Sequence, residues 1–260
     1  MTSVRVVAAE ALDTLAPDDP AAIRSRRDLW RIHGAMGTQA IVTTGLRSTL
    51  AVRPDGAPLR VLELGAGDGQ LMLGVARALA NHSAKHSASH SANPRIDLTL
   101  LDRQRLVAPA TIAGYAAVGW NAVQVSADVA DWAGAANSPQ AAMPHWDLIV
   151  ANLFMHHFEG ARLASLLGAI AQRCDRFFAC EPRRAWLALA GSHLVGAIGA
   201  NAVTRQDAVL SVHAGFRDTE LGALWPGHAA DWAVREYSAG LFSHCFYAER
   251  KAAPRAVLRP

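Results

Sequence analysis

Short apolar runs alternate with amphipathic stretches between residues 59 and 182 of the chain. The apolar runs predict strands at 59–64, 96–102, 121–128, 146–154 and 176–182. The stretches with helical periodicity lie at 71–80, 107–119 and 161–174. Strands that are separated by helices of this length favour right-handed crossovers. We therefore predict an α/β domain with a mostly parallel sheet and helices on both of its faces.

The start of the chain departs from this alternation. Residues 1–50 are predicted to form an N-terminal helical cap, in which Asp19 and Pro20 signal the start of a long helix. The sequence RPDGAP at 53–58 predicts a turn, because proline, aspartate and glycine favour turns. We therefore expect the main domain to span 51–260.

The pattern changes again after the fifth predicted strand. Residues 185–230 predict a helical insertion, with the polar stretch 201–208 as a turn between two helices. Runs at 232–238 and 241–250, with Gly240 between them, predict a final hairpin. The last strand is therefore expected to run antiparallel to its neighbours.

Composition narrows the class of protein. The chain has 260 residues, of which 51% are hydrophobic and 18% charged, so it can bury a full core. The formal net charge of +3 is small and dispersed, and we expect no nucleic-acid partner. No apolar run approaches the ~20 residues of a membrane span, and the first residues do not resemble a signal peptide. We expect a cytoplasmic protein without a membrane partner.

Cysteines and histidines give no sign of a metal site in the sequence. The three cysteines show no CxxC spacing, so we predict neither a zinc site nor a disulfide framework. The stretch 81–94 contains histidines spaced four apart among serines. We interpret it as a flexible solvated loop, with a metal-binding tract as the less favoured alternative.

A glycine-rich turn follows the first predicted strand. Gly65 and Gly67 lie between that strand and a helix, where a glycine backbone can turn sharply and approach a ligand closely. Glu63 and Asp68 flank this turn. Their carboxylates would repel the pyrophosphate of NAD or FAD but suit the positive sulfonium and amino groups of S-adenosylmethionine. We therefore predict S-adenosylmethionine as the cofactor.

Further acidic residues end the next two predicted strands. Asp102 is placed to accept hydrogen bonds from the two hydroxyls of a ribose. Asp128 is placed to bind the adenine amino group, and the ring of Trp132 to cover the base.

Four motifs resemble those of class I methyltransferases, which use S-adenosylmethionine. They are ELGAGDG at 63–69, LLD at 100–102, SAD at 126–128 and DLIVANLFMHHF at 147–158. The last is similar to the N-x-x-x-H-H pattern of the ubiquinone and menaquinone branch. The resemblance implies a Rossmann-like sheet of seven strands with a reversed terminal strand. It also implies cofactor contacts from Glu63, Gly65, Gly67, Asp102, Asp128 and Asn152.

A narrower resemblance involves three other segments. DLWRIHGAMG at 28–37, CEPRRAWLALAGS at 180–192 and NAVTRQDAVLSVHAGF at 201–216 look like small bacterial methyltransferases of polyketide or aromatic secondary metabolism. The chain has His33 where that pattern usually has asparagine.

His156 and His157 follow the fourth predicted strand and are the candidates for a catalytic base. Neighbours in an extended segment point in opposite directions, so at most one of them is expected to be catalytic. The alternative is that both cap the helix that follows. His213 and His244 are weaker candidates.

The methyl acceptor is expected between the N-terminal cap and the insertion at 185–230. The candidate substrate-binding residues are Trp30, Met36, Met155 and Arg205, with Phe154, Trp186 and Trp225 as further apolar candidates. The alternative for each apolar residue is a place in the core.

These features together predict a methyltransferase that acts on a small molecule. We expect O-methylation of a phenolic or polyketide-like acceptor, because histidine suits the removal of a hydroxyl proton. Transfer to carbon or nitrogen, a non-catalytic S-adenosylmethionine-binding protein and a Rossmann oxidoreductase are the alternatives. The sequence leaves the oligomeric state open.

Overall fold

The structure is a computed structural model. It describes residues 4–47, 49–50, 56–86, 95–134, 144–227 and 231–251, with the backbone alone for 83–86. Part of the predicted turn at 53–58 and part of the predicted loop at 81–94 lie outside these residues. None of the described helices is long and apolar enough to cross a membrane.

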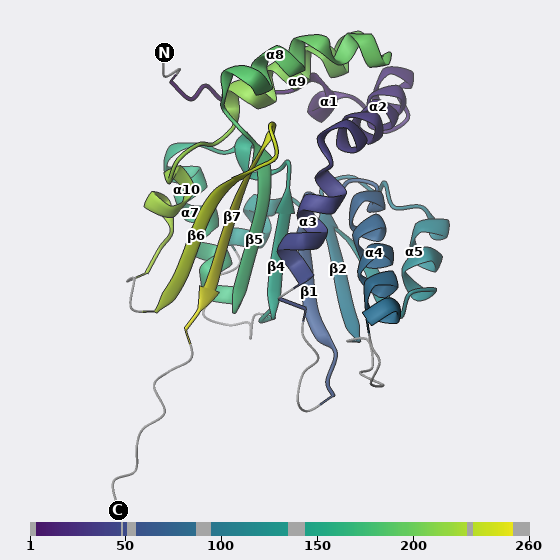
Figure 1. The fold of residues 1–260 in the computed structure, drawn as a ribbon, viewed down its shortest axis with the longest axis vertical. Coiled ribbons are helices and arrows are strands. Elements are labelled where there is room, and N and C mark those ends of the chain that lie inside the picture. The colour runs from purple at the N-terminus through teal and green to yellow at the C-terminus, as the bar shows by residue number, and fades with distance from the viewer. Residues whose placement is uncertain are drawn as a thin grey trace, which may run out of the picture.

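Seven strands form one sheet in the order β3-β2-β1-β4-β5-β7-β6 (Figure 1). The strands are β1 (Leu59–Leu64), β2 (Ile96–Asp102), β3 (Trp120–Ser126), β4 (Leu148–Asn152), β5 (Arg176–Pro182), β6 (Trp232–Ala239) and β7 (Ser243–Arg250). The first five are parallel, and β7 runs antiparallel to both β5 and β6. The predicted α/β class, the mostly parallel sheet and the reversed terminal strand are therefore confirmed.

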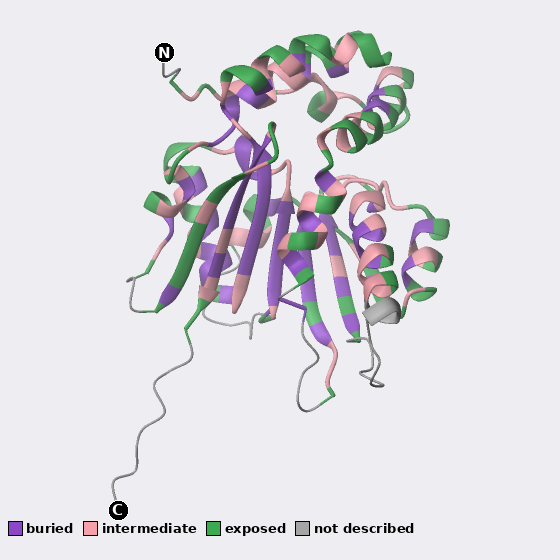
Figure 2. Cartoon of the chain, in the orientation of Figure 1, coloured by how far each residue is buried: buried purple, intermediate pink, exposed green. Residues whose placement is uncertain are grey.

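Helices cover both faces of the sheet, as predicted. One face carries α3 (Thr38–Arg47), α4 (Gln70–His86) and α5 (Pro109–Ala116). The other carries α6 (Val129–Gly134), α7 (Gly160–Arg173) and α10 (Glu220–Leu224). Alternate residues of each strand enter the two cores: Val150 and Phe178 lie in the first, Ile149 and Phe177 in the second. Figure 2 shows the central strands as the most buried part of the molecule.

A further helical layer lies over the carboxyl edge of the parallel strands (Figure 1). It consists of α1 (Ala11–Thr14), α2 (Pro20–Met36), α8 (Trp186–Leu194), η3 (Val195–Ile198) and α9 (Ala202–Ala214). Helix α2 begins at Pro20, as predicted, because the Asp19 side chain accepts a hydrogen bond from the Ala21 N–H at 2.7 Å. The division at residue 50 stays a prediction, although α3 packs on the sheet and Gly45 faces Phe178.

The predicted turn over 201–208 is wrong, because these residues form the first half of α9. Asn201 is the N-cap, and its side chain accepts a hydrogen bond from the Thr204 N–H at 2.8 Å. Thr204 and Asp207 are polar but buried, so the polar pattern that suggested a turn reflects tertiary contacts. Likewise, α4 continues to His86, into the stretch predicted as a loop.

Candidate functional site

A cavity of about 410 Å³ opens at the carboxyl ends of β1 and β4. The strand order reverses at this point, since β2 and β3 lie on one side of β1 and β5 lies beyond β4. Ligands of open α/β sheets bind at such switch points, and the volume is typical of a small-molecule site. It is lined by the ends of the first four strands and the turns that follow them. The N-terminal segment (residues 5–14), α2 and Ser211 of α9 complete the lining.

The glycine turn after β1 forms the floor of the cavity. Gly65 and Gly67 have φ values of 69° and 55°, a left-handed conformation that favours glycine. A Cβ atom at Gly65 would lie 2.2 Å from the Phe154 ring, which packs over the turn. Asp102 Oδ2 accepts a hydrogen bond from the Gly67 N–H at 2.9 Å, which connects the turn to the end of β2. These contacts hold the turn in place at the floor of the cavity.

Glu63 and Asn152 contribute unsatisfied polar atoms beside this turn. Glu63 Oε2 and Asn152 Oδ1 are buried and have no hydrogen-bond partner among the described residues. Burial, together with the charges of Asp68 and Asp102, raises the pKa of Glu63 to about 8. Leaving a buried acceptor unpaired costs free energy. The site is therefore complementary to a ligand that supplies hydrogen-bond donors and positive charge, as the amino group and sulfonium of S-adenosylmethionine do.

The other acidic candidates also line the cavity. Asp102 Oδ1 accepts a hydrogen bond from the Gln104 N–H at 2.9 Å, and Asp128 Oδ1 one from the Ala130 N–H at 2.7 Å. These bonds fix both carboxylates at the ends of their strands. Trp132 does not line the cavity: Arg173 lies 4.4 Å from the centre of its ring, which packs against the core around α7.

The chain turns sharply after β4 and forms η2 (Met155–His157). Glu181, at the end of β5, is fully buried, and Oε1 accepts hydrogen bonds from the Phe154 and Met155 N–H groups at 3.1 and 2.9 Å. The other oxygen, Oε2, lies 2.8 Å from His156 Nδ1. One carboxylate therefore holds both the start of this turn and the histidine ring.

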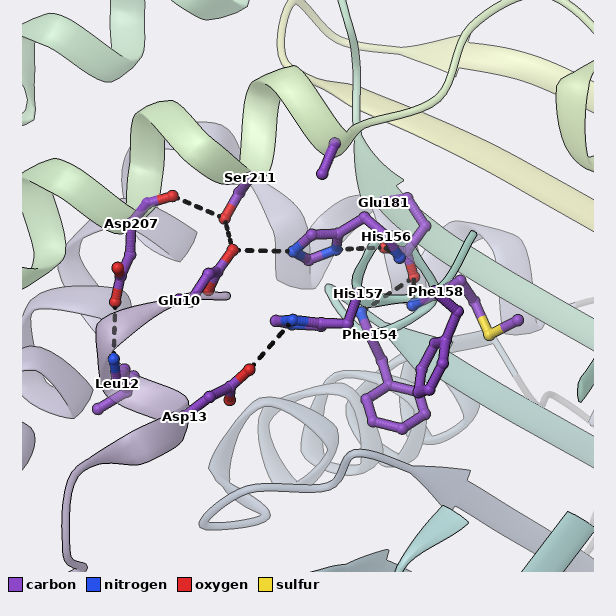
Figure 3. A network of polar contacts seen from close by, with 12 residues as sticks. Glu10, Leu12, Asp13, Phe154, His156, His157, Phe158, Glu181, Asp207 and Ser211 are labelled. Carbon is purple, nitrogen blue, oxygen red and sulfur yellow. Dashed lines mark hydrogen bonds and ion pairs between the residues drawn. The ribbon is translucent and has the colours of Figure 1, made fainter. Parts of the chain in front are cut away.

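His156 is enclosed between two carboxylates (Figure 3). Its second ring nitrogen, Nε2, lies 3.3 Å from Glu10 Oε1. Burial alone would lower the pKa of His156, but hydrogen bonds to Glu10 and Glu181 and their negative charges outweigh it and raise the pKa to about 9. The imidazole is therefore positively charged at neutral pH, so it has no free lone pair with which to accept a proton.

The N-terminal segment brings Glu10 to this position. Asp207 on α9 accepts hydrogen bonds from the Ala11 and Leu12 N–H groups at 2.8 and 2.9 Å, which caps α1. Ser211, one turn further along α9, donates a hydrogen bond to Glu10 (Figure 3). Arg5 donates to the carbonyls of His156, Phe158 and Ala214 at 2.7–3.0 Å.

His157 contacts Asp13 from the same segment. His157 Nδ1 lies 3.2 Å from Asp13 Oδ2, and the His157 side chain remains 22% exposed. Burial would raise the pKa of Asp13, but the hydrogen bond and charge of His157 and the charge of Arg103 outweigh it and lower the pKa. An ionised aspartate thus orients an imidazole at the wall of the cavity.

The structure separates the predicted site residues into two groups. Those that line the cavity are Trp30, Glu63, Gly65, Gly67, Asp68, Asp102, Asp128, Asn152, Phe154, His156 and His157. Met36, Trp132, Met155 and Arg205 are not among the lining residues. Met155 is fully buried in the core near Leu163, because η2 turns its side chain beneath the cavity. Arg205 packs against Gly196 of η3, outside the cavity.

The weaker candidates also lie elsewhere. Trp186 is 76% exposed, whereas Trp225 is buried and stacks on Phe177 at 5.6 Å. His244 Nε2 contacts Glu236 Oε1 at 2.8 Å, in a buried pair between β7 and β6.

Sequence reasoning missed Glu10, Asp13, Glu181 and Ser211, and noted His33 only as a departure from a pattern. Glu181 gave a usable signal, since it is a charged residue at the carboxyl end of a strand that is otherwise apolar. His33 faces the cavity, and burial lowers its pKa to about 4.

Comparison with solved structures finds proteins of similar architecture. The plantazolicin methyltransferase BpumL in complex with SAH has a TM-score of 0.57 and 13% identity over 90% of this chain and 92% of that chain. An O-methyltransferase family protein from Burkholderia thailandensis has a TM-score of 0.56 and 14% identity over 91% of this chain, which spans 62% of that protein. The pyocyanin biosynthetic protein PhzM has a TM-score of 0.50 and 17% identity over 90% of this chain and 60% of its own.

The sheet order and the reversed β7, together with these matches, decide the fold. The chain has the class I methyltransferase fold. The resemblance noted in the motifs is thus confirmed at the level of fold. In this class I methyltransferase fold, the glycine turn, Asp102 and Asp128 follow β1, β2 and β3 in succession. Neither the known family models nor the curated protein sequences gave a match.

Proposed function

We propose that this chain is an S-adenosylmethionine-dependent methyltransferase that acts on the oxygen of a small phenolic or polyketide-like acceptor. The observation that carries the proposal is the buried Glu63 Oε2, which has no hydrogen-bond partner among the described residues, in a carboxyl group that lines the cavity with the glycine turn. A cationic ligand would satisfy it and favour its ionised form, whereas a pyrophosphate would meet the negative charges of Asp68 and Asp102.

Each of the residues that line the cofactor half would bind one part of S-adenosylmethionine. Glu63 and Asn152 would hold the amino acid part of the cofactor, Asp102 the ribose and Asp128 the adenine. When bound, S-adenosylmethionine supplies a methyl group on a positively charged sulfur. The protein aligns the acceptor oxygen with that carbon and excludes water.

The acceptor would bind in the other half of the cavity. Leu29, Trp30 and Phe154 give this half apolar and aromatic walls, which suit an aromatic ring. His157, oriented by Asp13, is placed to take the hydroxyl proton while an oxygen lone pair forms the bond to the methyl carbon. The electrons of the broken carbon–sulfur bond remain on sulfur.

The test is calorimetric titration of the purified chain with S-adenosylhomocysteine, with NADH as the control ligand. Micromolar binding of the first alone is expected, and Glu63→Gln should weaken it. Transfer is then measured by mass spectrometry with a panel of phenols. Binding of NADH instead, or of neither ligand, would overturn the proposal. Methylation of amine or carbon acceptors alone would overturn the assignment to oxygen.

A further inference from the structure

Three side chains on the proposed acceptor side of the cavity form a cluster, and two of them, Glu10 and His156, have no part in the proposed proton transfer. Glu10, His156 and His157 each offer one ligand atom, and these atoms all lie within 4.8 Å of one another (Figure 3). Two imidazoles and one carboxylate are a set of ligands that binds divalent transition metals, and metal binding would displace the proton between His156 Nε2 and Glu10.

The spacing within this cluster suits a metal ion. Glu10 Oε1 and His156 Nε2 lie 3.3 Å apart. In a tetrahedral zinc site with bonds of about 2.0–2.1 Å, neighbouring ligand atoms are about 3.3 Å apart. The His156 and His157 rings are already close, with centroids 4.3 Å apart. The ligand atom of His157 lies within 4.8 Å of those of the other two side chains.

Each of the three side chains also has an outer hydrogen-bond partner. Glu181 contacts His156 at Nδ1, on the opposite side of the ring from Glu10. Asp13 contacts His157, and Ser211 donates to Glu10. Histidine ligands of metals commonly have a carboxylate on their second nitrogen, which fixes the ring orientation and raises its basicity.

We propose that Glu10, His156 and His157 form a binding site for a zinc-type divalent metal ion, with a fourth coordination position open to the cavity. Three protein ligands and one open position are typical of catalytic rather than structural zinc sites. No local sequence pattern indicates this site, because Glu10 lies 146 positions before His156 in the chain.

The open position faces the half of the cavity that we assign to the acceptor. A hydroxyl oxygen bound there would be held for attack and would lose its proton more readily. In this metal-bound form His157 is a ligand and not the base, and the metal ion promotes loss of the hydroxyl proton in its place. This role rests on the proposed function, whereas metal binding does not.

The test is titration of the purified, chelator-treated full chain with Zn²⁺ by calorimetry and with Co²⁺ by visible absorption. His82, His86 and His90 are replaced by alanine in every sample, because this run could bind metal by itself. One ion per chain is expected, with the Co²⁺ spectrum of a low-coordinate site. Glu10→Gln and His157→Asn should each weaken binding by more than tenfold, and Glu181→Gln by about 10- to 100-fold.

The matched control is Glu236→Gln. Glu236 pairs with His244 in a second buried carboxylate–imidazole contact, of 2.8 Å, that is not part of the metal-ligand cluster. This variant should bind Zn²⁺ as tightly as the parent. Circular dichroism and thermal melting verify that each variant is folded.

Two results would overturn the proposal: no stoichiometric binding by the parent chain, or binding that neither Glu10→Gln nor His157→Asn weakens. S-adenosylhomocysteine affinity, measured on the same samples, separates this inference from the proposed function. If S-adenosylhomocysteine binds and metal does not, the metal site alone is refuted. If metal binds and S-adenosylhomocysteine does not, the metal site stands and the methyltransferase assignment fails.

Discussion

His156 and His157 are adjacent in sequence but have different surroundings. Both ring nitrogens of His156 contact carboxylates, and only 2% of its side chain is exposed. His157 contacts one carboxylate, that of Asp13, and keeps 22% of its side chain exposed. Of the two, His157 is therefore the candidate for contact with the acceptor, and His156 is the residue that holds η2 in place.

This difference predicts the effect of removing His157. His157→Ala should lower kcat by about 10²- to 10⁴-fold, the usual contribution of an acid–base group. Binding of S-adenosylhomocysteine should not change, because the cofactor side of the cavity is intact. Steady-state kinetics and calorimetry measure the two effects. His145→Ala, at an exposed histidine paired with Asp175, is the control, and an unchanged rate in His157→Ala would exclude it as the base.

A second prediction concerns Gly65. Alanine at this position would place Cβ 2.2 Å from the Phe154 ring at a φ of 69°. We expect a loss of stability on the order of 1–3 kcal/mol together with weaker cofactor binding. The matched control is Gly168→Ala in α7, where a Cβ would meet nothing within 4 Å and alanine favours the helix. Thermal melts that ranked the two variants in the opposite order would contradict this account.

At the scale of elements, residues 5–14, which include α1, complete the side of the cavity that we propose for the acceptor. Asp207 accepts hydrogen bonds from two N–H groups of α1, and both Glu10 and Asp13 lie on or beside that helix. The position of these two carboxylates therefore depends on α9. The cofactor side depends instead on turns that directly follow the strands.

Asp207→Ala should affect the proposed acceptor side of the cavity and leave the proposed cofactor side unchanged. The loss of two hydrogen bonds should destabilise the protein by about 1–3 kcal/mol and loosen α1. We expect a raised KM for the acceptor and an unchanged Kd for S-adenosylhomocysteine. Asp97→Ala, at an exposed aspartate near the start of β2, is the control. An equal loss of cofactor affinity would show that α1 also supports the cofactor half.

The same division explains what the sequence could predict. The bounds of β1, β2 and β5 were predicted correctly, because most residues of these strands are buried and form short, largely apolar runs. Helix α9 was missed because its polar residues bind other segments of the chain. Glu10 and Asp13 were missed for the same reason: no local pattern shows that they meet residues almost 150 positions away.

At the scale of the whole molecule, the raised pKa of Glu63 makes the free energy of unfolding depend on pH. Its pKa is about 8 in the folded protein, against an ordinary value of 4.5. Between these values the unfolded chain loses the proton and the folded chain keeps it, so stability falls as pH rises. The contribution is fully present below about pH 4.5 and is lost as pH passes 8.

We therefore expect denaturant titrations of the ligand-free protein to show this loss, on the order of a few kcal/mol. Glu63→Gln should flatten the dependence, because glutamine does not ionise. Saturating S-adenosylmethionine should oppose the loss, since its positive charge favours the ionised carboxylate. An equally steep dependence in Glu63→Gln would assign the effect to other groups.

The docking of α1 on α9 also has a consequence for the order in which the site is assembled during synthesis. Ala11 and Asp207 are 196 positions apart, so a ribosome completes most of the chain before α1 can find its partner. The turns that we propose to hold the cofactor emerge earlier, within residues 59–152. The proposed cofactor half of the cavity can therefore form first in a nascent chain. The proposed acceptor half forms only after α9 has been synthesised and α1 can dock on it.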